Sequence, residues 1–438
     1  MKARALILLL CTAGLLTSVF WPNEVMSPSE VASSVPAASD GELLDLSQFA
    51  AKPAVQPTAD LAVVEVVEES LEPAQTAVVP QGVGSQRGSY RGMDPDSLVL
   101  QGEILAHDPT AMGAYLESVE LHPGRERFLD SCAFLANDQK EASMSSFSTL
   151  GADDPVSSTE LAVLKAALTA EGGVGLASAS AGAPSPLVTG LEIARLRIKL
   201  RDALRARDYK DACAALSSLL ETELGAEWEP HIESLTDWAK QLNNAQGFHR
   251  WSERGDWASM DYVVQPGDSL VAIRKKVIAE RPNLNLCTGL IQRANQLRDG
   301  NSIYPNQKLR IPLDPVHTLV SLKARFLLYY HGEEVVAAWP VTIGREDRTV
   351  PGEYTAGEKQ EEPMWFRQGD PVPFGEPDNP LGTRWIAWNG SNGLGFHGTW
   401  EPETIGQAAS DGCIRMRNED VEALFEVLPR GSRIVVLP

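Results

Sequence analysis

Short apolar runs separated by turns occupy residues 316–438. Polar and apolar residues alternate in several of these runs, which is typical of strands with one buried face. The segments predicted from this pattern are strands over 318–322, 325–330, 335–343 and 433–437, and a helix over 418–428. Gly332, Gly344 and Gly352 mark turns between the strands. The pattern predicts a mainly β domain, a sandwich or barrel-like arrangement, over residues 316–438.

A different period, of three to four residues, runs through residues 94–253. Leucine, isoleucine and alanine recur at this spacing among basic residues over 188–207, as in an amphipathic helix. Asp208 and Tyr209 break the pattern, and two further helices are predicted over 212–224 and 230–246. An α-helical region is therefore expected in the N-terminal half of the chain.

Residues 261–312 combine both periods in a small module. A short strand around Tyr262 meets the turn Pro266-Gly267, and Asp268 or Ser269 is placed to cap the helix that follows. A second helix and a closing strand complete the order strand, helix, helix, strand. The chain is thus expected to be multidomain, with an α-helical region, a βααβ module and a mainly β domain in succession.

The N-terminal residues have the pattern of an export segment. Lys2 and Arg4 precede an apolar run over 5–21 that ends at Pro22. The run is close to the length that spans a bilayer, so residues 1–22 are predicted to be a signal peptide or a retained membrane anchor. Residues 23–93 are rich in Ala, Val, Pro and Ser, include an acidic patch and keep no period, which predicts a disordered linker.

The charge and the cysteine pattern exclude some classes of partner and of fold. The formal net charge is −21, which argues against nucleic acid as a partner. Membrane contact is expected through the N-terminal segment only. The five cysteines have no paired spacing and no C-x-x-C, so a disulfide scaffold is not indicated. The seven histidines form no ligand spacing with Cys or Asp, so no metal site is expected. No cofactor is expected either.

Cys413 is the cysteine whose surroundings suggest chemistry. A thiol acts as a nucleophile when a neighbouring base takes its proton, and His397 precedes Cys413 by 16 residues (413 − 397). Gly412 permits an unusual turn that exposes backbone amides, and the N–H groups of Gly412 and Cys413 are candidates for an oxyanion hole. A cysteine and a histidine at this separation are usually unrelated, so the pair gains weight only within a longer pattern.

That longer pattern consists of Thr349-Val350-Pro351-Gly352, His397-Gly398-Thr399 and Ser410-x-Gly412-Cys413-Ile414-Arg415-Met416. It resembles the YkuD-type L,D-transpeptidase catalytic domain over residues 316–438. The resemblance implies a YkuD-like β-sandwich and an acyltransferase reaction through a cysteinyl thioester.

The resemblance also implies roles for single residues. Cys413 would be the nucleophile and His397 the base, with the Gly398 carbonyl orienting the imidazole in place of an acidic third member. Ser410 would shape the loop. Arg415 would bind substrate carboxylates, because a guanidinium suits bidentate contact.

Asp411 departs from the family pattern, in which His or Arg often precedes the glycine. A carboxylate near the thiol would raise the pKa of Cys413 unless it points away or pairs with a cation such as Arg415. We predict that Asp411 faces away from the sulfur. An alkylation pKa for Cys413 above that of free cysteine would speak against this prediction.

Residues 261–312 resemble a LysM domain, with Asn306 where the family usually has glycine. The resemblance implies binding of N-acetylglucosamine-containing glycans at the loop after Asp268 and the loop before Leu309. The alternative is a βααβ spacer without a ligand. The helix pairs of residues 94–253 faintly resemble a tetratricopeptide unit, although no clean repeat of about 34 residues is present.

Together these features imply an exported enzyme of the periplasm or cell envelope, held on peptidoglycan glycan strands by LysM and cross-linking stem peptides. Two alternatives stay open. Water could resolve the same acyl-enzyme, which gives an L,D-carboxypeptidase or hydrolase. A non-catalytic wall-binding scaffold could instead use the helical region to recruit a protein partner, whose identity the sequence does not indicate.

Overall fold

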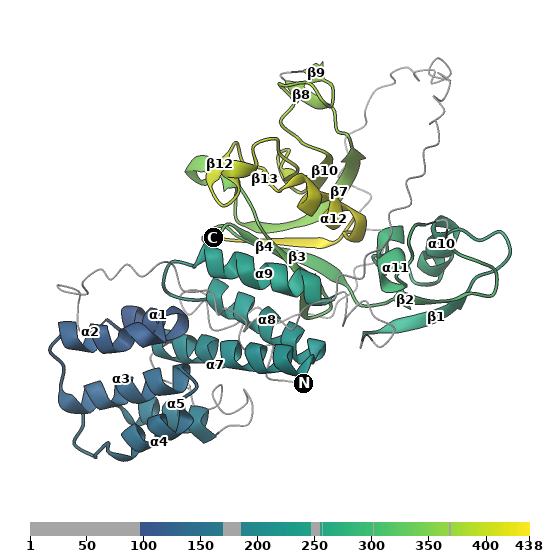
Figure 1. Cartoon of the computed structure of the whole chain (residues 1–438). Coiled ribbons are helices and arrows are strands. Elements are labelled where there is room, and N and C mark those ends of the chain that lie inside the picture. Colours follow the sequence, from purple (N-terminus) through teal and green to yellow (C-terminus); the bar gives the residue numbers. More distant parts are fainter. Residues whose placement is uncertain (1–96, 170–184, 247–254, 256, 301, 368) are drawn as a thin grey trace, which may run out of the picture. The chain divides into compact units, whose positions relative to one another are not determined.

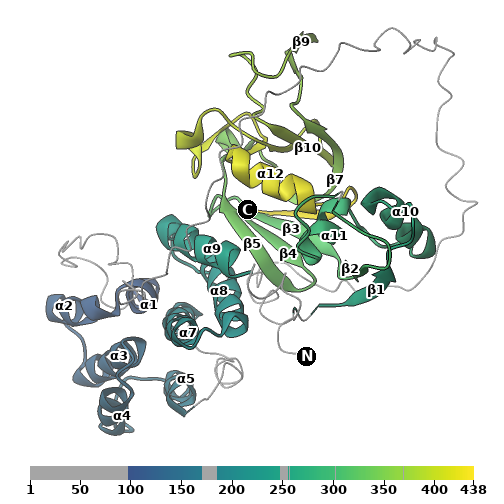
Figure 2. The same ribbon diagram turned by 45° about the vertical axis from the view of Figure 1, so that its right-hand side comes forward.

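The computed structural model describes residues 97–169, 185–246, 255, 257–300, 302–367 and 369–438 (Figure 1). The predicted signal or anchor over 1–22 and the predicted linker over 23–93 lie outside these residues. In the described part, the predicted succession of a helical region, a βααβ module and a mainly β domain is confirmed (Figures 1 and 2).

The helical region contains paired helices, each with one buried face. Their bounds are α1 Leu98–His107, α2 Met112–Ser118, α3 Pro123–Ala136, α4 Lys140–Ser148, α5 Ser158–Thr169, α7 Ser185–Ala206, α8 Tyr209–Leu224 and α9 Ile232–Gln246. Ser97 caps α1 by accepting the Leu100 N–H, and Asp208 caps α8 by accepting the Asp211 N–H. The sequence break at Asp208 is therefore the start of a capped helix.

The βααβ module pairs β1 (Ser259–Val263) antiparallel with β2 (Lys308–Pro312) beside α10 (Leu270–Glu280) and α11 (Thr288–Ala294). Of the two candidate caps for α10, Ser269 is the one whose side chain accepts the Ala272 N–H, at 3.2 Å. The Asp268 carboxylate instead bonds the Tyr262 hydroxyl and the Lys276 ammonium, both at 2.7 Å. Strand, turn and helix are thus joined by one polar cluster.

The C-terminal domain is a curled eight-stranded sheet in the order β13-β11-β10-β7-β14-β3-β4-β5, which confirms the mainly β prediction. The strands of this sheet are β3 Val316–Ser321, β4 Phe326–His331, β5 Glu334–Pro340, β7 Gly352–Glu361, β10 Arg384–Asn389, β11 Gly395–His397, β13 Ile414–Arg415 and β14 Arg433–Leu437. The other elements are β6 Ile343–Gly344 with β12 Ala408–Ser410, β8 Trp365–Arg367 with β9 Asp370–Val372, and the helix α12 Asn418–Val427.

The outer edge of β5 is covered by polar side chains of the helical region. Asn243 donates to the Ala338 carbonyl and accepts the Ala338 N–H, both at 3.0 Å. Gln246 Nε2 donates to the Val335 carbonyl at 3.3 Å. An uncovered edge strand offers its backbone groups to other chains, so α9 satisfies this edge in the way that a further strand would.

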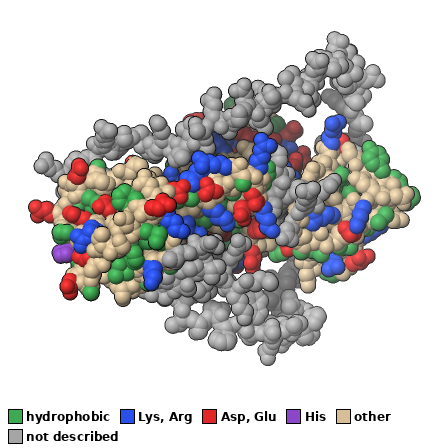
Figure 3. Space-filling model, turned by 60° about the horizontal axis from the view of Figure 1, so that its bottom comes forward, with side chains coloured by type: hydrophobic (Ala, Val, Ile, Leu, Met, Phe, Trp, Pro, Cys, Tyr) green, Lys and Arg blue, Asp and Glu red, His purple; other side chains and the backbone are tan. Residues whose placement is uncertain are grey.

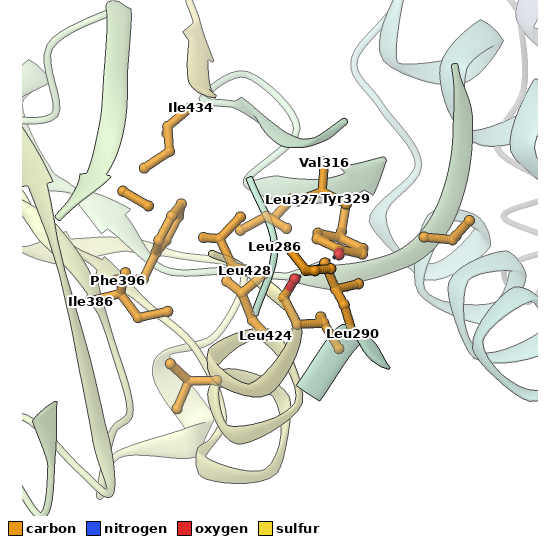
Figure 4. Packing of buried hydrophobic residues seen from close by; sticks show 14 of the residues in the cluster. Leu286, Leu290, Val316, Leu327, Tyr329, Ile386, Phe396, Leu424, Leu428 and Ile434 are labelled. Atoms are coloured by element: carbon orange, nitrogen blue, oxygen red, sulfur yellow. Dashed lines mark hydrogen bonds between the residues drawn. The ribbon is translucent and has the colours of Figure 1, made fainter. Parts of the chain in front are cut away.

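The βααβ module and the sheet share one apolar core (Figure 4). Leu286 and Leu290 of the module belong to the same buried cluster as Tyr329 of β4 and Leu424 of α12. The Tyr329 hydroxyl lies inside this core and donates a hydrogen bond to the Val427 carbonyl at 2.9 Å. The module and the sheet bury apolar side chains against each other, and this burial helps to hold the module against the sheet.

The face of the described residues drawn in Figure 3 is mixed in charge. Basic and acidic side chains are interspersed on it. Among the described helices, none combines the length and the apolar character needed to cross a membrane. Cys132, Cys213, Cys287 and Cys413 are free thiols, and Cys132 and Cys213 are buried.

Candidate active site

Cys413 and His397 come together at one edge of the sheet. The strand β11 ends at His397 and pairs in parallel with β13, with His397 opposite Arg415. Cys413 precedes β13 and lies two residues before Arg415. Side chains two residues apart along a strand lie on the same side of a sheet. Cys413 is two residues before Arg415, which pairs with His397, so this register favours Cys413 and His397 on the same side.

His397 is buried and held by its own neighbour. The ring is 4% exposed, and Nδ1 lies 2.6 Å from the Gly398 carbonyl, so the Nδ1–H donates to that oxygen. Burial lowers the pKa of His397 to about 4, although its backbone hydrogen bonds favour the protonated ring. The imidazole is therefore neutral at pH 7, with a tautomer that leaves Nε2 able to accept a proton.

Cys413 is half-buried just before β13, the strand that pairs with the strand of His397. Burial raises the pKa of the thiol, while a backbone hydrogen bond from Gly395 and the charge of Arg415 act in the opposite direction. The thiol hydrogen bond in this state goes to the Gly393 carbonyl, at 3.9 Å, rather than to the imidazole. The pair is accordingly a neutral thiol and a neutral imidazole, not a preformed ion pair.

The turn that carries the thiol is fixed by two hydroxyls. Ser410 Oγ donates to the Cys413 carbonyl at 2.6 Å and accepts the Gly412 N–H at 3.1 Å. Thr349 Oγ1 donates to the Gly412 carbonyl at 2.7 Å. The Gly412 N–H is thus bonded within the turn, so we assign the candidate oxyanion donor to the Cys413 N–H instead of that of Gly412.

Gly412 is required by its backbone conformation. Its φ is +132°, a region that side chains rarely adopt, and a Cβ there would lie 3.0 Å from Leu394 Cδ2 and 3.1 Å from the Arg348 carbonyl oxygen. The glycine allows the Ser410–Cys413 turn to pass this close to the neighbouring loop.

The two charged residues beside the turn are each paired. The Asp411 carboxylate binds Arg345 at 2.5 Å and Arg348 at 2.7 Å, and its side chain is 74% exposed. Its partners are therefore these two residues and not Arg415. The Arg415 guanidinium binds Glu401 at 2.8 Å. No group of three His, Cys, Asp or Glu side chains in the described ranges is placed to hold a metal ion.

Comparison with known proteins decides the family. The YkuD model, for the L,D-transpeptidase catalytic domain, matches residues 315–436, and the LysM domain model matches residues 262–312. A Bacillus subtilis protein named "Putative L,D-transpeptidase YqjB" is 34% identical over 139 residues, which cover 31% of this chain and 77% of that protein. The chain belongs to the L,D-transpeptidase family.

A second relative is matched over almost its whole length. The Bacillus licheniformis protein named "Putative L,D-transpeptidase YkuD" is 30% identical over 184 residues, which cover 40% of this chain and 98% of that protein. Among solved structures, the catalytic domain of an L,D-transpeptidase from E. faecium is 22% identical, with a TM-score of 0.24. It covers 28% of this chain and 98% of that one. The expected family resemblance, a YkuD L,D-transpeptidase domain preceded by a LysM domain, is confirmed by the family models and the relatives.

Asp411→Asn in this L,D-transpeptidase is expected to change the pKa of Cys413 only slightly. Asp411 is the weakest of the influences that raise or lower that pKa, and burial is the strongest. An alkylation pKa above that of free cysteine is expected in the wild type for this reason alone, so only the comparison with the variant tests Asp411. The measurement is the rate of alkylation by iodoacetamide against pH. A pKa that drops by a full unit in Asp411→Asn would contradict this assignment.

Gly398→Ala is expected to slow Cys413 acylation about 10- to 100-fold, because small displacements of a catalytic group have effects of this size. A Cβ at Gly398 would lie 2.1 Å from Asn418 Oδ1, which also accepts the Thr383 N–H at 3.2 Å. The carbonyl that orients His397 would have to move. Gly406→Ala is a matched control for a glycine in the same domain, since a Cβ there meets no atom within 4 Å, although its φ of +88° adds strain. Equal acylation rates for both variants would remove the orienting role from Gly398.

Proposed function

We propose that this L,D-transpeptidase cross-links peptidoglycan stem peptides through a thioester on Cys413. The observation that supports the proposal most is the neutral, buried His397, whose Nδ1 is fixed on Gly398 at the strand next to the thiol. The family membership gives the substrate class, and the LysM domain suggests binding to peptidoglycan. A cell-wall enzyme family also implies a location outside the cytoplasm.

The first half-reaction begins with proton transfer from the Cys413 thiol to His397 Nε2 as the sulfur attacks the carbonyl carbon of the third stem residue. The carbonyl electrons move to oxygen, and the Cys413 N–H stabilises the negative charge. When the tetrahedral intermediate collapses, the bond to the terminal D-alanine breaks. The imidazolium returns its proton to the leaving amine, and the thioester remains on Cys413.

The second half-reaction reverses these roles. His397 takes a proton from the amine of an acceptor stem, whose nitrogen attacks the thioester carbonyl. The carbon–sulfur bond breaks and the proton returns to sulfur, so the free thiol and a new amide are formed. Neither half needs a carboxylate partner for the imidazole, because the Gly398 carbonyl fixes its tautomer.

Arg415 is proposed to bind a substrate carboxylate. Its guanidinium is mostly buried and bonds Glu401, whose own side chain is 61% exposed. A substrate carboxylate would then displace, or bind beside, this exposed carboxylate. Ser410 is proposed to act through the turn and not on substrate, since its hydroxyl is used twice inside residues 410–413.

The remaining parts are proposed to deliver this domain to the wall. Residues 1–22 would hold or export the chain, residues 23–93 would act as the linker, and the LysM domain would bind glycan. Only the LysM and L,D-transpeptidase assignments come from the family models.

Product analysis separates transpeptidation from hydrolysis. The full chain is incubated with purified disaccharide tetrapeptides, with Cys413→Ala as the control, and products are identified by mass spectrometry. The proposal predicts dimers that have lost one terminal D-alanine. Release of D-alanine without any dimer would favour the carboxypeptidase alternative, and no turnover together with retained wall binding would favour the scaffold.

A further inference from the structure

Residues 379–383, which lead into β10, pack directly against the peptide that joins His397 to Gly398. A Cβ placed on Gly382 would lie 2.5 Å from the carbonyl carbon of Gly398, and a Cβ on Gly398 would lie 3.0 Å from the Thr383 nitrogen. Two backbones approach this closely only where no side chain stands between them. The position of residues 379–383 therefore limits where the Gly398 carbonyl, which holds His397 Nδ1, can lie.

The same segment also contacts the imidazole. Burial is the largest influence on the pKa of His397 and lowers it, whereas hydrogen bonds to the backbone of Gly398 and of Leu381 raise it. A hydrogen bond that raises the pKa of a histidine favours its protonated form. Both backbone contacts therefore favour the imidazolium that forms when His397 takes the proton of Cys413.

The carboxamide of Asn379 fixes the Leu381 end of this segment. Asn379 is 1% exposed, and its Oδ1 accepts the Leu381 N–H at 3.0 Å. Its Nδ2 lies 2.9 Å from the carbonyl oxygen of Pro363, 3.0 Å from that of Val372 and 3.1 Å from that of Pro373. The acceptor and both N–H groups of the carboxamide are thus engaged, so its orientation is set by four backbone partners.

Three of these partners belong to the two ends of the β8–β9 hairpin. Pro363 lies before β8, Val372 is the last residue of β9, and Pro373 follows it. The Asn379 carboxamide therefore closes the base of the hairpin and joins it to the segment beside His397. Removal of the carboxamide would leave these buried backbone groups without a partner, which costs more than the bonds themselves contribute.

The carboxamide of Asn418 holds the other end of the segment. Asn418 is the first residue of α12, and its Oδ1 accepts the Thr383 N–H at 3.2 Å. The same oxygen would lie 2.3 Å from a Cβ on Gly382. The helix itself is fixed in the core by Val421 and Leu424, which are fully buried. Residues 379–383 are thus held between two asparagines, one from the hairpin side and one from α12.

We propose that Asn379 and Asn418 are positioning residues for His397 and act through residues 379–383. Asn379 fixes the Leu381 end and Asn418 fixes the Thr383 end, so the backbone between them keeps the Gly398 carbonyl on Nδ1. Neither carboxamide needs to touch substrate for this role. The inference rests on the proposed function, because that function makes His397 the base.

Kinetics and nuclear magnetic resonance on the full chain, prepared with isotope-labelled histidine, test this role. Asn379→Ala and Asn418→Ala are each expected to slow acylation of Cys413 by a carbapenem about 10- to 100-fold, with the half-saturating concentration unchanged. The Nδ1–H resonance of His397 is expected to exchange with solvent faster in both variants. Asn418→Asp keeps an acceptor oxygen at the same size and is expected to recover most of the rate.

Asn295→Ala is the matched control for the loss of a bonded carboxamide. Asn295, in the LysM domain, donates to the carbonyls of Ile291 and Arg310 at 2.8 Å each and accepts the Arg310 N–H at 2.7 Å. Its removal deletes bonds of the same kind and should lower Tm, but the acylation rate and the His397 resonance should stay as in the wild type.

A wild-type rate and an unchanged Nδ1–H resonance in both Asn379→Ala and Asn418→Ala would overturn the inference. Equal slowing in Asn295→Ala would also overturn it, because a general loss of stability would then explain the effect. Circular dichroism identifies a variant that does not fold, in which case the other asparagine carries the comparison. If the wild type itself is not acylated, the proposed function fails, and the Nδ1–H resonance alone decides the positioning role.

Discussion

Cys413→Ala is expected to abolish acylation by a carbapenem, a β-lactam proposed to react with the same nucleophile as the stem peptide, with a loss of at least about a thousandfold in rate. The reason is chemical, because the variant has no nucleophile at the strand that faces His397. Intact-protein mass spectrometry after incubation with the β-lactam measures the adduct. Far-UV circular dichroism should be unchanged, since the half-buried sulfur contributes little to the core.

Cys287→Ala is the matched control for this loss. Cys287 is also a free, partly buried thiol, and it lies in the LysM domain, where Sγ bonds the Glu426 carbonyl at 3.1 Å. Burial raises the pKa of Cys287 as it does that of Cys413, so burial alone does not distinguish them. A full adduct on Cys413→Ala, or loss of the adduct in Cys287→Ala, would show that another thiol is the nucleophile.

His397→Gln is expected to slow acylation by about 100- to 10,000-fold, which is the usual contribution of a general base. The wild-type rate should be nearly constant from pH 7 to pH 5 and fall as the pH passes through about 4, where His397 becomes protonated. The residual rate of the variant should not fall in this way as the pH passes through about 4. His317→Gln, a histidine on β3 whose ring stacks on Tyr330, is the control and should retain the wild-type rate.

His397 is also expected to make the free energy of unfolding depend on pH. The unfolded chain protonates His397 near its ordinary pKa of 6.5, whereas the folded chain does so only near 4. The unfolded state therefore binds more protons between these values, and acidification from pH 6.5 to 4 should cost about 3 kcal/mol of folding free energy. Urea denaturation at both pH values measures it. A pH dependence in His397→Gln equal to that of the wild type would contradict the buried, neutral imidazole.

Patterns local in sequence predicted the strands β3, β4, β5 and β14 and the helix α12 of the sheet domain, but not β7, β10, β11 and β13. The predicted strand over 433–437 is β14, and the predicted helix over 418–428 is α12 within one residue. The run predicted as one strand over 335–343 is two, β5 and β6, because Pro340 ends the first. Cys413 and His397 could be singled out because thiol chemistry needs a base and because short motifs surround both.

Contacts between distant segments could not be predicted in the same way. The Thr349 hydroxyl that bonds the Gly412 carbonyl is 63 residues away in the chain. Nothing near Asp411 in sequence indicated that Arg345 and Arg348 would neutralise it. The engagement of the Gly412 N–H by Ser410 also depends on the turn geometry, so both backbone amides were equal candidates before the fold was known.

The proposed thioester on Cys413 is tested most directly by trapping it. The full chain is mixed with a disaccharide tetrapeptide, quenched in acid within its first turnover and digested, and the peptides are sequenced by tandem mass spectrometry. The expected result is a disaccharide tripeptide attached to the peptide that contains Cys413, with one D-alanine released per adduct. Formation of cross-linked product with no adduct on Cys413, or with the adduct on another residue, would contradict the proposed mechanism.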